Sequence, residues 1–181
     1  MKLPESALYV LLFLRALPIL AQNEIKQIES IRSLYQDTNA KIAQMQKDPS
    51  VASIYSIELT VNHGEAQYPA IGTFKEVTRF YYTFGDREKN PYPDRLLKIE
   101  VTTTRAARLE SAEFLFDANG ELVFCFEKHE TEMRYYFARG KIIRMQREST
   151  RLNPADASES KSIQSVQARA RRLVEIFKRA L

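Results

Sequence analysis

Cys125, Glu127 and His129 come closest to the residue types and spacing of a metal site. Thiolate, carboxylate and imidazole groups all bind zinc. On a strand these alternate positions project from one face, but neighbouring positions on that face lie about 7 Å apart. A shared ion needs each donor atom at about 2 Å, so only a strongly bent strand could bring the three together. A charged turn after a strand is the simpler interpretation, and we expect no metal and no cofactor.

The rest of the chain contains no recognised catalytic motif. It has no G-x-S-x-G elbow, H-E-x-x-H pair, Walker loop or C-x-x-C pair. His63 precedes Gly64 and is expected to be solvated loop surface. The only cysteine, Cys125, is expected to be a buried apolar residue rather than a nucleophile. We therefore expect no enzymatic activity, with a hydrolase or a metal-dependent enzyme as an alternative.

The N-terminal residues 1–21 resemble a secretory signal. They begin with Lys2, continue with an apolar run from Ala7 to Leu14, and end at Ala21. The whole apolar stretch has 15 residues and contains Arg15, whereas a membrane-spanning helix needs roughly 20 apolar residues. The sequence thus predicts a signal peptide and a secreted or periplasmic protein with one domain, residues 22–181. An uncleaved anchor and a buried N-terminal helix are alternatives.

Two segments without glycine or proline, 22–48 and 155–181, flank a middle part rich in aromatic residues. In each flank the apolar residues recur every three, four or seven positions, which predicts an amphipathic helix. The first apolar stripe contains Ile28, Ile31, Tyr35, Ile42 and Met45; the second contains Ile163, Val166, Ala170, Leu173, Val174, Phe177 and Leu181. Asp48-Pro49 should end the first helix, and Asp156 with Glu159 has the spacing of a capping box for the second.

The middle part alternates apolar and polar residues, as at 55–61 and 97–102, which is typical of strands with one buried face. A type I turn with a bulge at Gly120 predicts one shared face for five residues, Phe114, Phe116, Leu122, Phe124 and Phe126. The same turn at 138–140 places five more on one face, Met133, Tyr135, Phe137, Ile143 and Met145. The predicted fold is α+β: an N-terminal helix, about seven antiparallel strands in a meander, and a C-terminal amphipathic helix on the same sheet face.

This element order, together with the phrases "IRSLYQDTNAKI" and "YYFARGKIIR", resembles small bacterial exported proteins of unassigned function and cystatin-like folds. The resemblance implies an α+β fold and assigns no functional residue.

Two surfaces are candidate binding sites. The uncovered sheet face should display apolar residues together with tyrosine and arginine, which are typical of interfaces. Its candidate partner-binding residues are Arg79, Tyr81, Arg134, Tyr136 and Arg144. The C-terminal segment 161–181 carries a net charge of +5, whereas 22–160 carries −2. Its basic face could contact an anionic membrane or an acidic partner, or could be simply solvated. That face consists of Arg169, Arg171, Arg172, Lys178 and Arg179.

These observations favour a non-catalytic protein that binds a protein or envelope partner through the open sheet face; we expect no nucleic acid as partner. The alternative is a carrier of a small apolar ligand held between the sheet and the helices. Phe80, Phe84, Phe116 and Phe124 would line that cavity.

Overall fold

The computed structural model describes the backbone of residues 5–69, 72–106 and 108–181, with side chains from residue 22 onward. Within these ranges it contains helices before and after an antiparallel sheet of nine strands, which confirms the predicted α+β class. The elements are α1 (Glu5–Lys47), the 3₁₀ helix η1 (Pro49–Val51), β1 (Tyr55–Val61), β2 (Gln67–Tyr68), β3 (Gly72–Thr83), β4 (Arg95–Arg105), β5 (Arg108–Phe116), β6 (Leu122–Lys128), β7 (Glu132–Ala138), β8 (Lys141–Arg147), β9 (Thr150–Arg151) and α2 (Ala157–Arg179).

The sheet is a meander, as expected. Its strands follow the order β1-β3-β4-β5-β6-β7-β8-β9, and β2 pairs with β3. The two-residue strands β2 and β9 bring the strand number above the expected seven.

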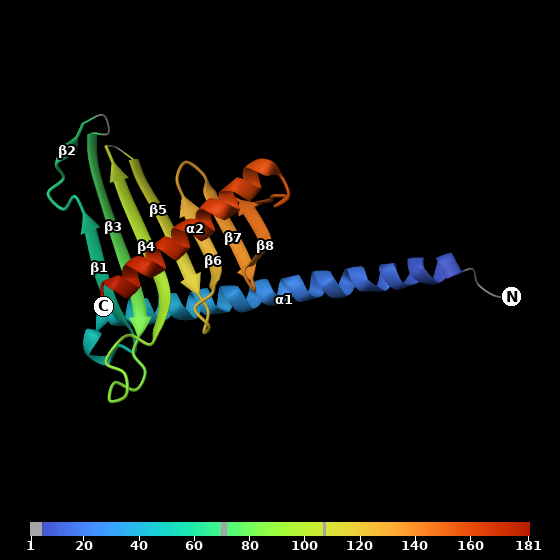
Figure 1. Cartoon of the computed structure of the whole chain (residues 1–181), viewed down its shortest axis with the longest axis horizontal. Helices are drawn as coiled ribbons and strands as arrows, with labels where there is room; N and C mark the ends of the chain where they lie inside the picture. Colours follow the sequence, from blue (N-terminus) through green and yellow to red (C-terminus); the bar gives the residue numbers. More distant parts are fainter. Residues whose placement is uncertain (1–4, 70–71, 107) are drawn as a thin grey trace.

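The two helices lie on opposite faces of the sheet, so the prediction that both cover one face is wrong. In Figure 1, α2 crosses in front of the strands and α1 passes behind them. Neighbouring residues of β3 show this alternation. Phe80 belongs to the cluster that includes Phe177 of α2, whereas Tyr81 belongs to the cluster that includes Ile42 of α1.

Three β-bulges explain why the predicted faces are wrong. Leu97, Val123 and Ile143 are each an extra residue with no partner across the ladder, on β4, β6 and β8 respectively. A bulge places two consecutive side chains on one face and reverses the alternation beyond it. Phe114, Phe116 and Leu122 therefore share the α2 face, but Phe124 and Phe126 lie on the α1 face.

The two tight turns differ from each other. Gly120 has a φ of 76° and its N–H donates to the carbonyl of Asp117, as in the predicted type I turn with a glycine bulge. Arg139 and Gly140 both have positive φ, at 52° and 71°, which is the pattern of a two-residue type I′ turn. The bulged turn predicted there is wrong, and Ile143 lies on the α1 face instead of beside Met145.

The helix boundaries agree with the sequence patterns. α1 ends at Lys47, and the Asp48 side chain accepts a hydrogen bond from the Ser50 N–H at the start of η1. Asp156 is the N-cap of α2, but its side chain makes no capping hydrogen bond. Glu159, the other half of the predicted capping box, instead forms an ion pair with Arg147 at 3.1 Å.

The predicted signal segment, residues 1–21, lies outside the residues whose side chains are described, and its cleavage stays a prediction. Among the described residues, the search for a helix apolar and long enough to cross a membrane found none.

Candidate functional site

The sheet face that we expected to be open is covered by α1. Tyr81 and Tyr136 are only 1% and 3% exposed beneath this helix. The three arginines predicted beside them are held by carboxylates: Arg79 by Glu58 at 2.8 Å, Arg134 by Glu132 at 2.6 Å and Arg144 by Glu24 of α1 at 3.0 Å. The bulges add apolar side chains to this face, and α1 covers them with its own apolar stripe. Tyr81 and Tyr136 are therefore not exposed as predicted, whereas partner binding by the three arginines stays a prediction.

A buried polar network joins α1 to this face. The Lys98 ammonium, 2% exposed, lies 2.7 Å from both the Glu100 and the Glu113 carboxylates and 2.8 Å from Oδ1 of Asn39 on α1. The Tyr35 hydroxyl, also on α1, donates to Glu113 at 2.7 Å. The alternation of residues 97–102 places Lys98 on the face opposite Ile99, as the structure has it. Lys98 is buried because α1 covers that face, which the sequence pattern did not indicate.

The network fixes the protonation states of its members. Burial lowers the pKa of Lys98, but the Glu113 and Glu100 carboxylates outweigh this effect and raise that pKa above the ordinary value. Burial, together with Glu113, raises the pKa of Tyr35, so its hydroxyl stays a hydrogen-bond donor. The lysine charge is compensated by two carboxylates, and its three donors are occupied. These contacts fasten a helix to a sheet rather than form an open site.

The basic residues of α2 lie on its solvent side, as expected. Arg171, Arg172, Lys178 and Arg179 are exposed, whereas Arg169 leans onto the sheet, 3.4 Å from Glu127. Lys178 pairs with Glu175 of the same helix at 3.1 Å. Whether this face meets a membrane or an acidic partner stays a prediction.

An apolar groove separates α2 from the turns at the lower end of the sheet. It consists of two cavities, of about 580 and 370 Å³, which share Phe116, Gly120, Val174 and Lys178. Leu122 lines the larger cavity, and Leu96 and Phe177 line the smaller. We call this region the hairpin groove. Its size falls within the range of roughly 300–1,000 Å³ that is typical of small-molecule sites.

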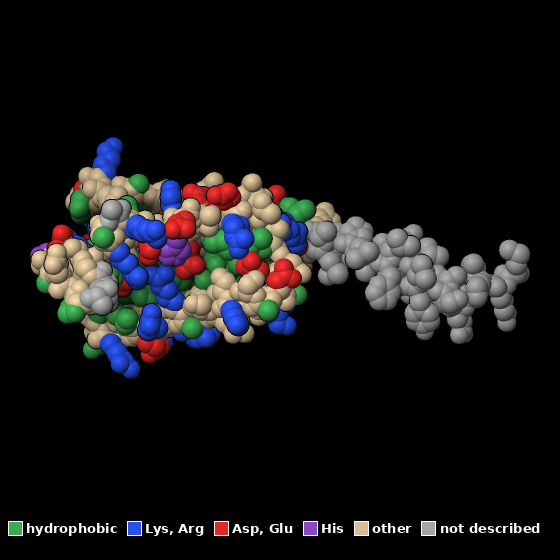
Figure 2. Space-filling view, turned by 90° about the horizontal axis from the view of Figure 1, so that it is seen from above, with side chains coloured by type: hydrophobic (Ala, Val, Ile, Leu, Met, Phe, Trp, Pro, Cys, Tyr) green, Lys and Arg blue, Asp and Glu red, His purple; other side chains and the backbone are tan. Residues whose placement is uncertain are grey.

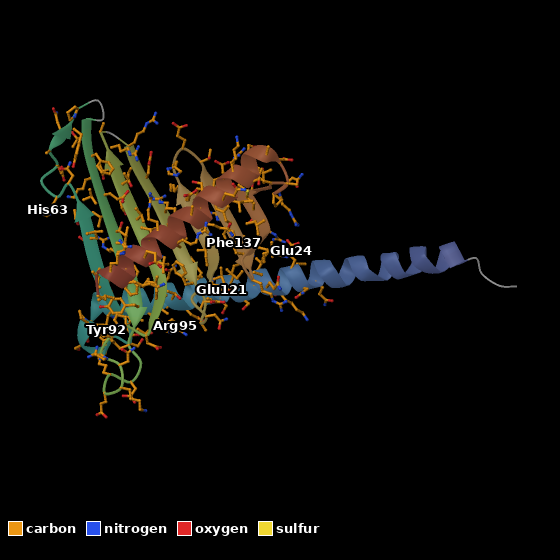
Figure 3. All side chains as sticks on the ribbon, viewed as in Figure 1. Glu24, His63, Tyr92, Arg95, Glu121 and Phe137 are labelled. Carbon is orange, nitrogen blue, oxygen red and sulfur yellow. The ribbon has the colours of Figure 1, made fainter. Side chains whose placement is uncertain are left out.

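Charged groups border the hairpin groove at both of its cavities. Arg171, Glu121 and Glu175 lie around the larger cavity, and Arg95 and Asp94 around the smaller. The buried Nε atom of Arg95 has no hydrogen-bond partner among the residues that the structure describes. Figure 3 shows Arg95 and Glu121 at the same end of the sheet. The groove thus combines an apolar floor with an arginine whose buried Nε lacks an acceptor among the described residues.

The part of α2 beside the hairpin groove is held mainly by apolar contacts. Polar contacts join the first half of the helix to the sheet: Tyr135 to Ser162 at 2.7 Å, and Gln167 to the carbonyl of Gly140 at 2.9 Å. Beyond residue 169, no hydrogen bond or ion pair among the described residues links α2 to the sheet. Phe177 contacts Phe80 there, with ring centroids 5.6 Å apart.

The four phenylalanines predicted to line one ligand cavity do not do so. Phe116 lines the hairpin groove, Phe80 is buried in the α2-side core and Phe84 packs against that core. Phe124 lies on the opposite face, in contact with Tyr35 of α1 at a centroid distance of 5.4 Å. The bulge at Val123 is the reason for this division.

The residues first considered for zinc binding are placed in different surroundings. Cys125 is fully buried in the core, as expected, and burial raises the pKa of its thiol well above the ordinary value. Glu127 lies next to Arg169, and His129 lies 3.5 Å from Glu110. His63 is exposed in the loop after β1 (Figure 3), as expected.

A small charged pocket lies on the other side of α2, toward the upper strand ends. It has a volume of about 230 Å³, and its lining includes Glu76, Thr103, Arg105, Glu110, His129, Arg169 and Arg172. Seen from above, basic and acidic side chains gather together over the middle of the molecule (Figure 2). We call this region the charged pocket.

Comparisons with protein-family models, with curated proteins and with solved structures found no match for this chain.

Proposed function

We propose that this protein is an exported, non-catalytic binding protein that carries a single-chain amphiphile with an anionic head in the hairpin groove. The composition of residues 1–21 supports export. The observation that carries the proposed function is a groove between α2 and the sheet that combines apolar side chains with Arg95, whose buried Nε has no partner among the described residues.

The groove suits such a ligand for two physical reasons. Its floor of Phe116, Leu122 and Val174 offers apolar surface to a hydrocarbon tail, and each buried methylene contributes about 0.8 kcal/mol. An anionic head next to Arg95 would accept the hydrogen bond that its Nε lacks. Charge-assisted hydrogen bonds of this kind are about twice as strong as neutral ones.

The attachment of α2 also favours this function. Within the described part of the chain, only apolar contacts hold its last two turns to the sheet, so an outward shift of that part of the helix would break no hydrogen bond to the described sheet residues. The exposed Arg171 and Lys178 beside the groove would attract an anionic head during entry.

Calorimetric titration of the purified protein with decanoate tests the proposal. We expect saturable binding at one site. Val174→Glu places a charge in the groove wall and should weaken binding at least ten-fold. Ala168→Glu is the matched control, because Ala168 is an exposed residue of the same helix away from the groove. Absence of binding, or equal binding by both variants, would contradict the proposal.

A second titration tests the role assigned to Arg95. The wild-type protein should bind decanoate more tightly than decanol, which has the same tail without the charge. Arg95→Gln should remove this preference while leaving the affinity for decanol unchanged. An unchanged preference in this variant would show that Arg95 does not recognise the head.

A further inference from the structure

The floor of the charged pocket is a row of polar side chains that crosses three adjacent strands. Glu76 of β3 pairs with Thr103 of β4, which in turn pairs with Glu110 of β5. His129, just beyond β6, extends the row and lies 3.5 Å from Glu110. All of these residues line the same cavity. The floor therefore carries one carboxylate on each side of the buried Thr103.

Arginines form the opposite wall of the pocket. Arg169 and Arg172 reach it from α2, and Arg105 reaches it from the end of β4. Arg169 is partly engaged, because Glu127 lies 3.4 Å from it. Arg105 lies over the Phe74 ring at 5.6 Å, and neither it nor Arg172 has a carboxylate within 4.0 Å among the described residues.

Opposite charges thus line one cavity without pairing across it. The Thr103 hydroxyl donates to Glu76 at 3.2 Å, and His129 is the partner of Glu110. Within the described part of the chain, neither carboxylate has a lysine or arginine within 4.0 Å. The glutamate and arginine side chains are long enough to form ion pairs with each other if the pocket were collapsed. Instead, the strand register and the position of α2 hold the two signs of charge apart.

We propose that the charged pocket binds a free amino acid, with the ligand carboxylate on Arg105 and Arg172 and its ammonium group between Glu76 and Glu110. Guanidinium groups bind carboxylates through paired hydrogen bonds, and the two glutamates would accept from the ammonium. A simple anion would be repelled by the glutamates, and a simple cation by the arginines. This site is independent of the hairpin groove, since it lies across α2 from it.

Calorimetric titration with matched small molecules tests the proposal. Glycine and norvaline carry both charges; acetate and pentanoate lack the amine; methylamine and butylamine lack the carboxylate. We expect at least one of the two amino acids to bind at millimolar or lower concentration, about ten-fold more tightly than its single-charge analogues. Failure of both amino acids to bind, or equal affinity for either analogue, would overturn the proposal.

Three variants locate the binding. Arg172→Gln and Glu110→Gln should each weaken amino-acid binding at least ten-fold, because each removes one charged partner of the ligand. Arg179→Gln removes an exposed arginine of the same helix outside the pocket and should leave the affinity unchanged. Thermal unfolding of each variant checks that the fold is retained. Unchanged affinity in both pocket variants, or equal loss in the control, would contradict the assignment.

Discussion

Each face of the sheet is covered by one amphipathic helix, but the contacts beneath the two helices differ. On the α2 face, the buried side chains form one continuous apolar cluster from Phe80 to Met145. On the α1 face, two smaller apolar clusters are separated by the network around Lys98. The Glu24 carboxylate adds a further link to α1 through Arg144 and Arg151, at 3.0 and 3.1 Å (Figure 3).

The difference is one reason why we propose ligand binding on the α2 face. Hydrogen bonds and ion pairs have defined geometry, so α1 is fixed to its face at several points along its length. Apolar contacts have no direction, and the second half of α2 depends on them. The larger cavities lie beside that half of α2, so the proposed binding site is on the α2 face, whereas the polar contacts of the α1 face hold α1 in place.

The largest expected effect comes from a core substitution on the α2 face. Phe114 is 0% exposed, and Phe114→Ala should lower the free energy of unfolding by about 4 kcal/mol because it leaves a cavity. Phe126 lies on the other face and is only partly buried, so Phe126→Ala should cost clearly less. Urea titration of both variants measures the difference. Equal losses would mean that the two faces contribute equally to stability.

The second effect concerns the buried charge on the α1 face. Lys98→Met should cost about 3 kcal/mol, because it leaves the carboxylates of Glu100 and Glu113 without their cation. Adding Glu113→Gln should recover part of that loss. Guanidinium unfolding of the single and double variants would show it. A single variant as stable as the wild type would mean that the network does not hold α1.

The two faces of the sheet also show how much of this structure the sequence could predict. The helices, the meander and the turn at Gly120 follow from periodicity and from glycine placement. The assignment of residues to faces fails, because the bulges at Leu97, Val123 and Ile143 use residues that carry no turn signal. A buried lysine such as Lys98 has the same sequence pattern as an exposed one. The hairpin groove depends on the position of α2 relative to the turns, which no local pattern specifies.

A smaller effect should follow from removing one hydroxyl under α1. Tyr35→Phe deletes the hydrogen bond to Glu113 and should cost about 2 kcal/mol, since the acceptor is charged. Hydrogen–deuterium exchange should then show faster exchange in α1 with little change in α2. Equal acceleration in both helices would mean that the two faces are not independent.

The smallest effect is a pH dependence on the α2 face. Burial raises the pKa of the Cys125 thiol, so the folded protein keeps this proton at a pH where the unfolded chain, with its thiol near pH 9, loses it. Stability should therefore fall as pH rises above 9, by about 1 kcal/mol at pH 10. Cys125→Ala should lose less stability between pH 8 and 10. Thermal unfolding at several pH values checks this, and parallel curves would contradict it.

The most direct test of the central claim is a residue-by-residue map of decanoate binding by NMR chemical shifts. Binding in the hairpin groove should change the shifts of Leu122, Val174 and Lys178, whereas Tyr136 under α1 should be unaffected. Changes centred on Tyr136 and α1, or no changes at all, would contradict it.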